Sequence, residues 1–167
     1  TRKMGERGIV AQPNLSMAMI KSVLVSMRPH QWIKNGFVLL PLIFAQQATE
    51  LSKALQGGFA FALFCFLASG MYLINDLADV ERDRLHPRKK FRPISAGTLP
   101  THLARQIAWV LISVSLALGL VLQWRFGCAL FAYFTINLLY TFKLKHVVIA
   151  DVSVIASGFL LRVLAGG

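Results

Sequence analysis

The residues best suited to chemistry lie in one polar stretch, NDLADVERDRLHPRKKFRPISAG (75–97), which separates two apolar runs and holds three of the chain's four aspartates. If a helix continues through this stretch to Asp83, Asn75 and the three aspartates lie within an arc of about 100°, whereas Glu81 points away. Carboxylates on one helix face repel one another unless a cation compensates them. Oxygen ligands of this kind suit Mg²⁺, which combines one or two carboxylates with water and substrate phosphate. The predicted magnesium ligands are Asn75, Asp76, Asp79 and Asp83.

A basic run follows the aspartates directly. His86 and Pro87 are expected to end the helix, because proline disfavours helical geometry in the residue before it. Cations next to a carboxylate–metal face can neutralise the charge that develops as a diphosphate leaves. Lys89, Lys90 and Arg92 are therefore predicted to contact phosphate. The alternative is a solvated loop, in which the basic residues only set the topology and the aspartates pair with them.

The composition indicates a membrane protein. Of the 167 residues, 56% are hydrophobic, and the mean hydropathy is +0.59. Globular domains are usually about 45–50% apolar. The net charge of +11 gathers in short segments between the apolar runs, as in cytoplasmic loops of membrane proteins, so we expect no nucleic-acid partner. Cys65 and Cys128 lie inside apolar runs without ligand spacing and are expected to act as small hydrophobic residues.

The predicted fold is all-α, a polytopic bundle of transmembrane helices. Residues 1–32 are expected to form a cytoplasmic N-terminal segment and residues 33–167 the membrane domain, with a cytoplasmic loop at about 76–102. A helix needs about 20 mostly apolar residues to cross a bilayer. Five segments span or nearly span it by this measure, at 33–48, 54–74, 103–122, 126–142 and 147–167.

The distribution of Lys and Arg predicts the orientation. Fifteen of these residues lie up to residue 34, at 82–105 and at 143–145, whereas only Lys53 and Arg125 lie in the alternate segments. Segments rich in Lys and Arg usually face the cytoplasm. We therefore expect a multi-pass protein of the cytoplasmic (inner) membrane, with the N-terminus and the aspartate loop in the cytoplasm.

The motif N-D-x-x-D-x-x-x-D, at Asn75, Asp76, Asp79 and Asp83, resembles the first aspartate-rich motif of the UbiA superfamily of intramembrane prenyltransferases. Within the superfamily, the chain looks most like the decaprenyl-phosphate phosphoribosyltransferases. The similar stretches are RPHQWIKN (28–35), residues 75–97, YTFKLKHVVIADV (140–152) and SGFLLRVLAGG (157–167). Family members have about nine helices, so we expect this chain to be roughly the N-terminal half of the bundle.

The resemblance also implies a reaction and a set of partners. Enzymes of this branch transfer 5-phosphoribose from phosphoribosyl diphosphate to a polyprenyl phosphate such as decaprenyl phosphate. The acceptor oxygen attacks C1 of the ribose while the Mg²⁺-bound diphosphate departs. The resemblance implies that Asn75, Asp79 and Asp83 hold the metal for catalysis and that Asp76 supports them. Phosphoribosyl diphosphate, the polyprenyl phosphate and membrane lipids are thus the expected partners.

Further polar residues are candidate substrate contacts. Lys34 could reach an anionic head group or could equally be an interfacial lysine. Tyr140 and Lys143 could line the substrate cavity, although residues that only set the membrane topology would be found at the same positions. Asp151 is a candidate for binding the ribose or for helping the metal site. Arg162, inside an apolar segment, is expected to stabilise the bundle by bonding to another helix.

Two other functions fit the same sequence. An aromatic prenyltransferase of the same superfamily would use a polyprenyl diphosphate as donor. A non-catalytic membrane domain, or an inactive fragment, would only bind lipid.

Overall fold

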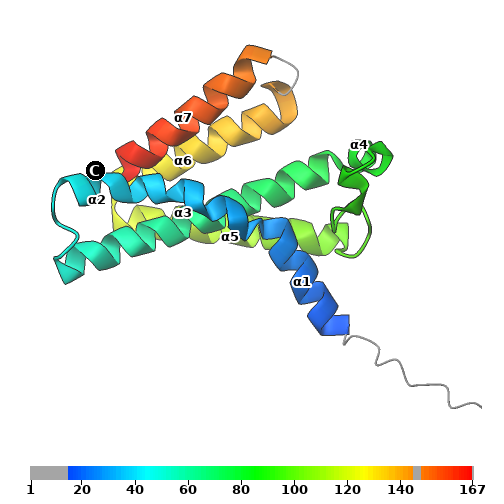
Figure 1. Cartoon of the computed structure of the whole chain (residues 1–167), viewed down its shortest axis with the longest axis horizontal. Coiled ribbons are helices and arrows are strands. Elements are labelled where there is room, and N and C mark those ends of the chain that lie inside the picture. The colour runs from blue at the N-terminus through cyan, green and yellow to red at the C-terminus, as the bar shows by residue number, and fades with distance from the viewer. Residues whose placement is uncertain (1–14, 145–147, 167) are drawn as a thin grey trace, which may run out of the picture.

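The fold is a bundle of helices. We analysed a computed structural model, which describes the backbone of residues 15–144 and 148–166 and the side chains of residues 16–143 and 153–166. Within these ranges the chain forms helices and no strand, which confirms the predicted all-α class (Figure 1). In chain order the elements are α1 (Leu15–Met27), the 3₁₀ helix η1 (Pro29–Leu39), α2 (Leu40–Phe44), α3 (Leu51–Ala78), α4 (Val80–Leu85), the 3₁₀ helix η2 (Lys89–Phe91), α5 (Thr101–Leu122), α6 (Trp124–Leu139), the π-helix η3 (Tyr140–Leu144) and α7 (Val148–Gly166).

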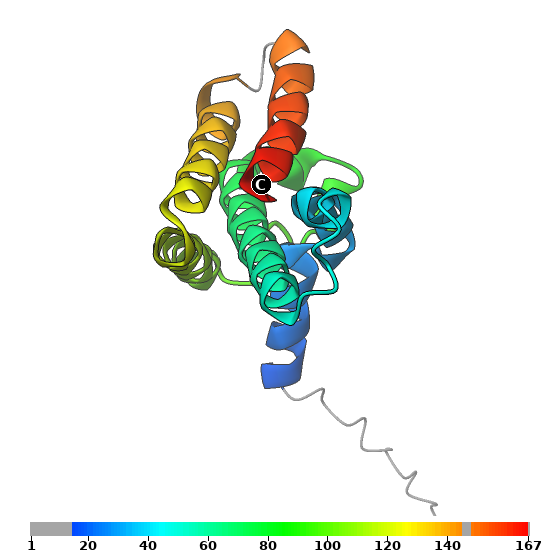
Figure 2. The same ribbon diagram turned by 90° about the vertical axis from the view of Figure 1, so that its left-hand side faces the viewer.

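Helix α3 is the centre of the bundle. Its side chains Phe64, Leu67 and Leu73 are completely buried, and α5, η1, α1 and α6 pack against it, while α7 packs against α6 and η1 (Figure 2). Gly70 allows a close approach to α5, because a Cβ atom there would lie 3.0 Å from the carbonyl oxygen of Ala108. A small residue at this position therefore lets two long helices approach closely, as is common in membrane bundles.

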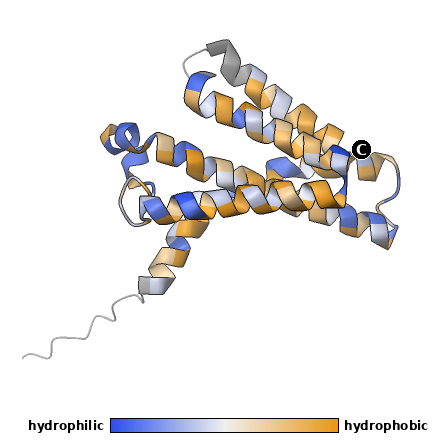
Figure 3. Ribbon diagram, turned by 180° about the vertical axis from the view of Figure 1, so that it is seen from behind, coloured by the Kyte–Doolittle hydropathy of each residue, from blue (hydrophilic) through white to orange (hydrophobic). Residues whose placement is uncertain are grey.

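Two helices of the described chain, α3 and α5, are long and apolar enough to cross a membrane. Helix α5 also carries large apolar side chains on its outer surface, such as Trp109, Val110 and Val121. Apolar residues extend along the helices, whereas polar residues gather towards the ends of the bundle (Figure 3). An apolar outer surface of this kind suits lipid rather than water.

Four of the five predicted segments form helices close to their predicted ranges, as α3, α5, α6 and α7. The first segment, at 33–48, differs, because η1 and the short helix α2 replace a regular α-helix. Pro41 accounts for part of this break, since it lies where η1 gives way to α2 and proline removes a backbone donor. A 3₁₀ helix of 11 residues is unusually long. Helix α1, within the predicted N-terminal segment, was not anticipated.

Arg162 holds η1 against the bundle. Its guanidinium is buried and donates hydrogen bonds to Asn35 Oδ1 (2.8 Å), to the Gly158 carbonyl (2.8 Å) and to the Tyr133 hydroxyl (3.2 Å). The same group lies 4.9 Å from the centroid of the Tyr133 ring. These contacts join α7, α6 and η1, and they confirm the stabilising contact to another helix that was predicted for Arg162.

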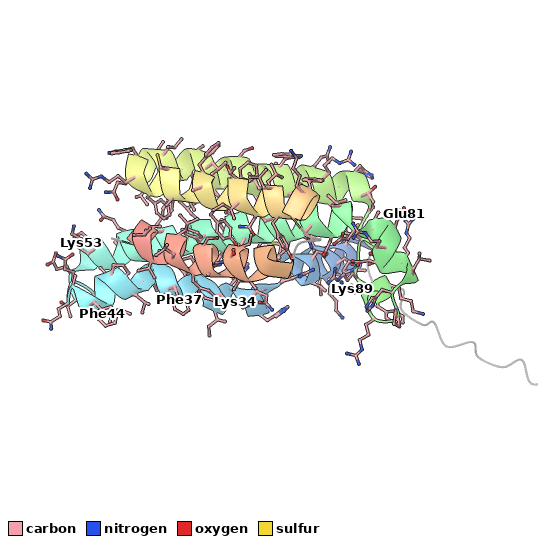
Figure 4. The ribbon with its side chains drawn as sticks, turned by 90° about the horizontal axis from the view of Figure 1, so that it is seen from above. Lys34, Phe37, Phe44, Lys53, Glu81 and Lys89 are labelled. Carbon is pink, nitrogen blue, oxygen red and sulfur yellow. The ribbon has the colours of Figure 1, made fainter. Side chains whose placement is uncertain are left out.

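The C-terminal ends of α3 and α6 lie at the same end of the bundle as α4 (Figure 1). Glu81 and Lys89 mark this end, and Phe44 and Lys53 mark the opposite one (Figure 4). The aspartate-rich stretch and the loop that follows it are therefore brought together at one end of the long helices.

Candidate functional site

The aspartates lie where α3 gives way to α4. The prediction assumed one helix through Asp83, but α3 ends at Ala78 and the backbone of Asp79 departs from helical geometry (φ −100°, ψ 0°). Helical hydrogen bonding nevertheless continues across the break, because the Asp79 N–H donates to the Asn75 carbonyl (3.1 Å) and the Asp83 N–H to the Asp79 carbonyl (2.8 Å). The spacing of the side chains around the helix is thereby largely preserved.

Burial confirms that the aspartates share one face. Asp76, Asp79 and Asp83 are 2%, 6% and 2% exposed, whereas the side chain of Glu81 is 80% exposed and pairs with Arg84 at 3.0 Å. Asn75 is half-buried on α3. Carboxylates are rarely buried unless they are paired or bind a metal. The face that was predicted from the spacing therefore points into the protein and needs positive charge.

Arginine supplies this charge. One guanidinium nitrogen of Arg92 donates to Asp83 Oδ2 at 2.6 Å and to Asp76 Oδ1 at 3.0 Å, so that it bridges the two carboxylates. Arg28 donates to the same oxygen of Asp76 at 2.6 Å. Asp79 lies 3.8 Å from Arg82. The aspartates thus pair with basic residues, as the alternative of a solvated loop predicted, but they are buried and not solvated as that alternative required.

Arg28 is a member of the site that the sequence did not reveal. It lies 48 positions before Asp76 and precedes η1 in a left-handed conformation (φ 54°, ψ 59°). Such a backbone is uncommon for a residue other than glycine and is often found at functional sites. Its guanidinium also lies 4.9 Å from the centre of the Tyr72 ring. The only sequence signal was its place at the start of the family-like stretch 28–35.

A hollow of about 400 Å³ opens beside these ion pairs. It lies where the end of α1, the start of η1, the end of α3 and the segment around η2 meet. Arg92 and Asp76 were predicted as site residues, whereas its other basic side chains were not. Its lining consists of Val25, Ser26, Arg28, His30, Asp76, Arg88, Phe91, Arg92 and Pro93.

The other predicted contacts come from η2, η1, η3 and α7. Lys89 and Lys90 are exposed in η2, and Lys34 is exposed on η1, part of the way along the bundle (Figure 4). In η3, which follows α6, Tyr140 is half-buried and Lys143 is exposed. Asp151 belongs to α7, but its side chain lies outside the described residues.

The donor atoms of the cluster suit Mg²⁺, since carboxylate and amide oxygens are its preferred protein ligands. Among the side chains that the structure describes, no three His, Cys, Asp or Glu residues gather as a metal site. The Arg92 guanidinium already bridges Asp76 and Asp83 as a cation. The chemistry of the ligands therefore fits magnesium, provided that Asp83 exchanges its arginine for the metal.

The helical bundle, with apolar outer faces and buried aspartates at one end, agrees with the fold expected from the resemblance to intramembrane prenyltransferases. The chain belongs to the UbiA prenyltransferase family, whose model matches residues 36–167. It is 42% identical over 158 residues to the decaprenyl-phosphate phosphoribosyltransferase of Mycolicibacterium smegmatis, covering 92% of this chain and 48% of the relative. The enzymes of the same name from Corynebacterium glutamicum and Mycobacterium tuberculosis are 41% and 38% identical, over 92% and 95% of this chain and 46% and 53% of their own lengths. The chain thus spans about half the length of these relatives.

Proposed function

We propose that this chain provides the donor-binding part of a membrane transferase that moves 5-phosphoribose from phosphoribosyl diphosphate to a polyprenyl phosphate such as decaprenyl phosphate, releasing diphosphate. The observation that carries the proposal is the convergence of Asp76 and Asp83 with Arg28 and Arg92 at one end of the bundle. The names and identities of the relatives support the phosphoribosyl donor over other donors.

In the proposed reaction, an oxygen of the polyprenyl phosphate attacks C1 of the ribose while the C1–diphosphate bond breaks. No nucleophile from the protein is required, because the acceptor is already an anion. The protein therefore acts by positioning both substrates and by stabilising the charge that passes to the leaving group. Arg92 is well placed for this role because it already bridges the acidic face, and Lys89 and Lys90 are close to it in sequence.

Magnesium is the cofactor that we propose for this site. Asn75, Asp79 and Asp83 would hold it, with Asp76 fixing the two arginines, and it would neutralise the departing diphosphate. Asp76 is assigned the supporting role because one of its oxygens already accepts hydrogen bonds from both Arg28 and Arg92.

We further propose that the aspartate end of the bundle faces the cytoplasm and that the chain lies in the inner membrane. Seven Lys and Arg residues lie at 82–105, from α4 to the start of α5, whereas Lys53 lies at the opposite end of α3 and Arg125 follows the opposite end of α5, at the start of α6. The water-soluble donor would then enter from the cytoplasm and the lipid acceptor from the bilayer. Lys34, Tyr140, Lys143 and Asp151 remain proposed substrate contacts.

Transfer of label tests the proposal. Membranes that contain the protein expressed from its native gene are supplied with ribose-labelled phosphoribosyl diphosphate and decaprenyl phosphate. We expect a lipid-linked phosphoribose whose formation is lost in Asp83→Asn and retained in Glu81→Gln, since Glu81 points to solvent. Prenylation of an aromatic acceptor from a polyprenyl diphosphate, without that product, would support the aromatic prenyltransferase instead. Equal product in Asp83→Asn and the unaltered protein would overturn the assignment of the site.

A further inference from the structure

The hollow beside Asp76 has the wrong charge for a site that only holds a metal. Three guanidinium groups line it, from Arg28, Arg88 and Arg92, and His30 adds an imidazole. Asp76 is the single carboxylate of the lining, and it already accepts hydrogen bonds from two of the arginines. The hollow therefore keeps an excess of positive charge, which suits an anion.

We propose that this hollow binds a phosphate monoester, namely the 5-phosphate of the donor, separately from the diphosphate that the aspartates bind. The proposal rests on the proposed function. Phosphoribosyl diphosphate carries a diphosphate at C1 and a phosphate at C5, so an enzyme that holds the ribose between them needs two anion sites. A polyprenyl diphosphate has one charged end and would leave the hollow without a role.

Arg92 connects the two sites. It lines the hollow, and the same guanidinium donates to Asp83, which lies outside the lining. The planar guanidinium can contact a phosphate and a carboxylate at once through different N–H groups. A ligand that reaches from the hollow to Asp83 would therefore pass along Arg92, with its two charged ends on either side of this residue.

Arg28 is held in place before any ligand arrives. Its left-handed backbone, the hydrogen bond to Asp76 and the contact with the Tyr72 ring together fix the side chain. A cation that is already ordered loses less conformational freedom on binding a ligand. The strained backbone conformation of Arg28 thus directs its guanidinium towards the anion that it would share with Arg88 and Arg92.

The size of the hollow favours the donor over the lipid acceptor, whose head group is also a phosphate monoester. A volume of about 400 Å³ is at the small end of ligand sites and suits a sugar phosphate better than a long isoprenoid chain. The two sources of the phosphate can be separated experimentally, because ribose 5-phosphate and a short polyprenyl phosphate share only the anion.

Binding to the purified chain in nanodiscs of neutral lipid tests the proposal. Ribose 5-phosphate, pyrophosphate with Mg²⁺, and geranyl phosphate are titrated separately into the unaltered chain and into Arg28→Gln. We expect Arg28→Gln to weaken ribose 5-phosphate about ten- to a hundredfold, the usual effect of losing a charged hydrogen bond, and to change pyrophosphate less than about threefold. Arg84→Gln, which removes an exposed arginine at the same end of the bundle, should change neither ligand.

A second variant tests the hollow independently, in case Arg28→Gln does not fold. Arg88 is exposed, so Arg88→Gln should leave the fold intact and still weaken ribose 5-phosphate. If Arg28→Gln and Arg88→Gln lost binding of geranyl phosphate while their affinity for ribose 5-phosphate was unchanged, the hollow would belong to the acceptor and the inference would be overturned. Equal weakening of pyrophosphate and ribose 5-phosphate would also overturn it, because the two sites would be one. Binding of ribose 5-phosphate that depends on Arg28, together with no phosphoribosyl transfer, would uphold the hollow and refute the proposed function.

Discussion

Removing Arg92 should reveal how strongly the acidic face depends on this one cation. The side chains of Asp76 and Asp83 are each 3% exposed, and both accept a hydrogen bond from the same nitrogen of Arg92. In Arg92→Gln, Asp76 keeps Arg28, whereas Asp83 loses the cation 2.6 Å from its oxygen. The change therefore leaves a buried carboxylate with much of its charge uncompensated.

The expected loss of stability follows from this geometry. Breaking a buried ion pair by removing one partner costs about 3–5 kcal/mol. Arg92 is itself 27% exposed, so water can replace part of its interaction, and we expect about 2–4 kcal/mol. Arg84→Gln serves as the matched control, because its partner Glu81 is 80% exposed and such pairs contribute about 0–1 kcal/mol.

Thermal unfolding of the chain in one detergent, with and without Mg²⁺, measures this effect. We expect Arg92→Gln to lower the melting temperature clearly more than Arg84→Gln does. Added Mg²⁺ should restore part of the loss, since a ligand at about 100 times its Kd stabilises by about 2.7 kcal/mol. Equal melting temperatures for the two variants would refute the reasoning that Arg92 compensates buried charge. If Mg²⁺ did not raise the lowered melting temperature of Arg92→Gln, the view that metal and arginine compete for Asp83 would be refuted.

Two further changes test the packing. Arg162→Ala should destabilise the chain by about 3 kcal/mol, because three hydrogen bonds of a buried guanidinium are lost, whereas the exposed Arg125→Ala should change the melting temperature little. Gly127→Ala should cost about 1–3 kcal/mol, since its Cβ would lie 2.8 Å from the Cα of Leu120, whereas Gly58→Ala meets no atom within 4 Å and should be neutral or slightly stabilising. Thermal unfolding checks both pairs, and equal shifts within a pair would contradict the packing described.

The acidic face could be predicted because it depends on local periodicity. Spacings of three and four residues determine which side chains share a face, and the backbone hydrogen bonds across Asp79 preserve that spacing even though the helix breaks there. The break itself was not predictable, because neither residue next to Asp79 in the sequence is a proline or a glycine. The predicted helix end at His86 is confirmed, since α4 ends at Leu85.

The partners of the face were harder to predict because they come from distant positions. Arg28 reaches Asp76 across 48 residues. Its position depends on a left-handed backbone, which an arginine before Pro29 does not predict. Lys89, Lys90 and Arg92 are equivalent by position in the sequence and all three remain proposed phosphate contacts, yet only Arg92 forms ion pairs with the buried aspartates, while Lys89 and Lys90 are exposed in η2. Three-dimensional packing, rather than composition, decides which of several neighbouring cations enters the site.

The aspartate face is proposed to bind the diphosphate of the donor through a divalent ion. Equilibrium binding of phosphoribosyl diphosphate to the chain, with Mg²⁺ and with a chelator, tests this claim most directly in the unaltered chain and in the double variant Asp79→Asn, Asp83→Asn. We predict that Mg²⁺ raises the affinity of the unaltered chain by at least about tenfold and has little effect on the double variant. The same affinity with Mg²⁺ and with chelator in the unaltered chain would contradict binding of the diphosphate through a metal at this face.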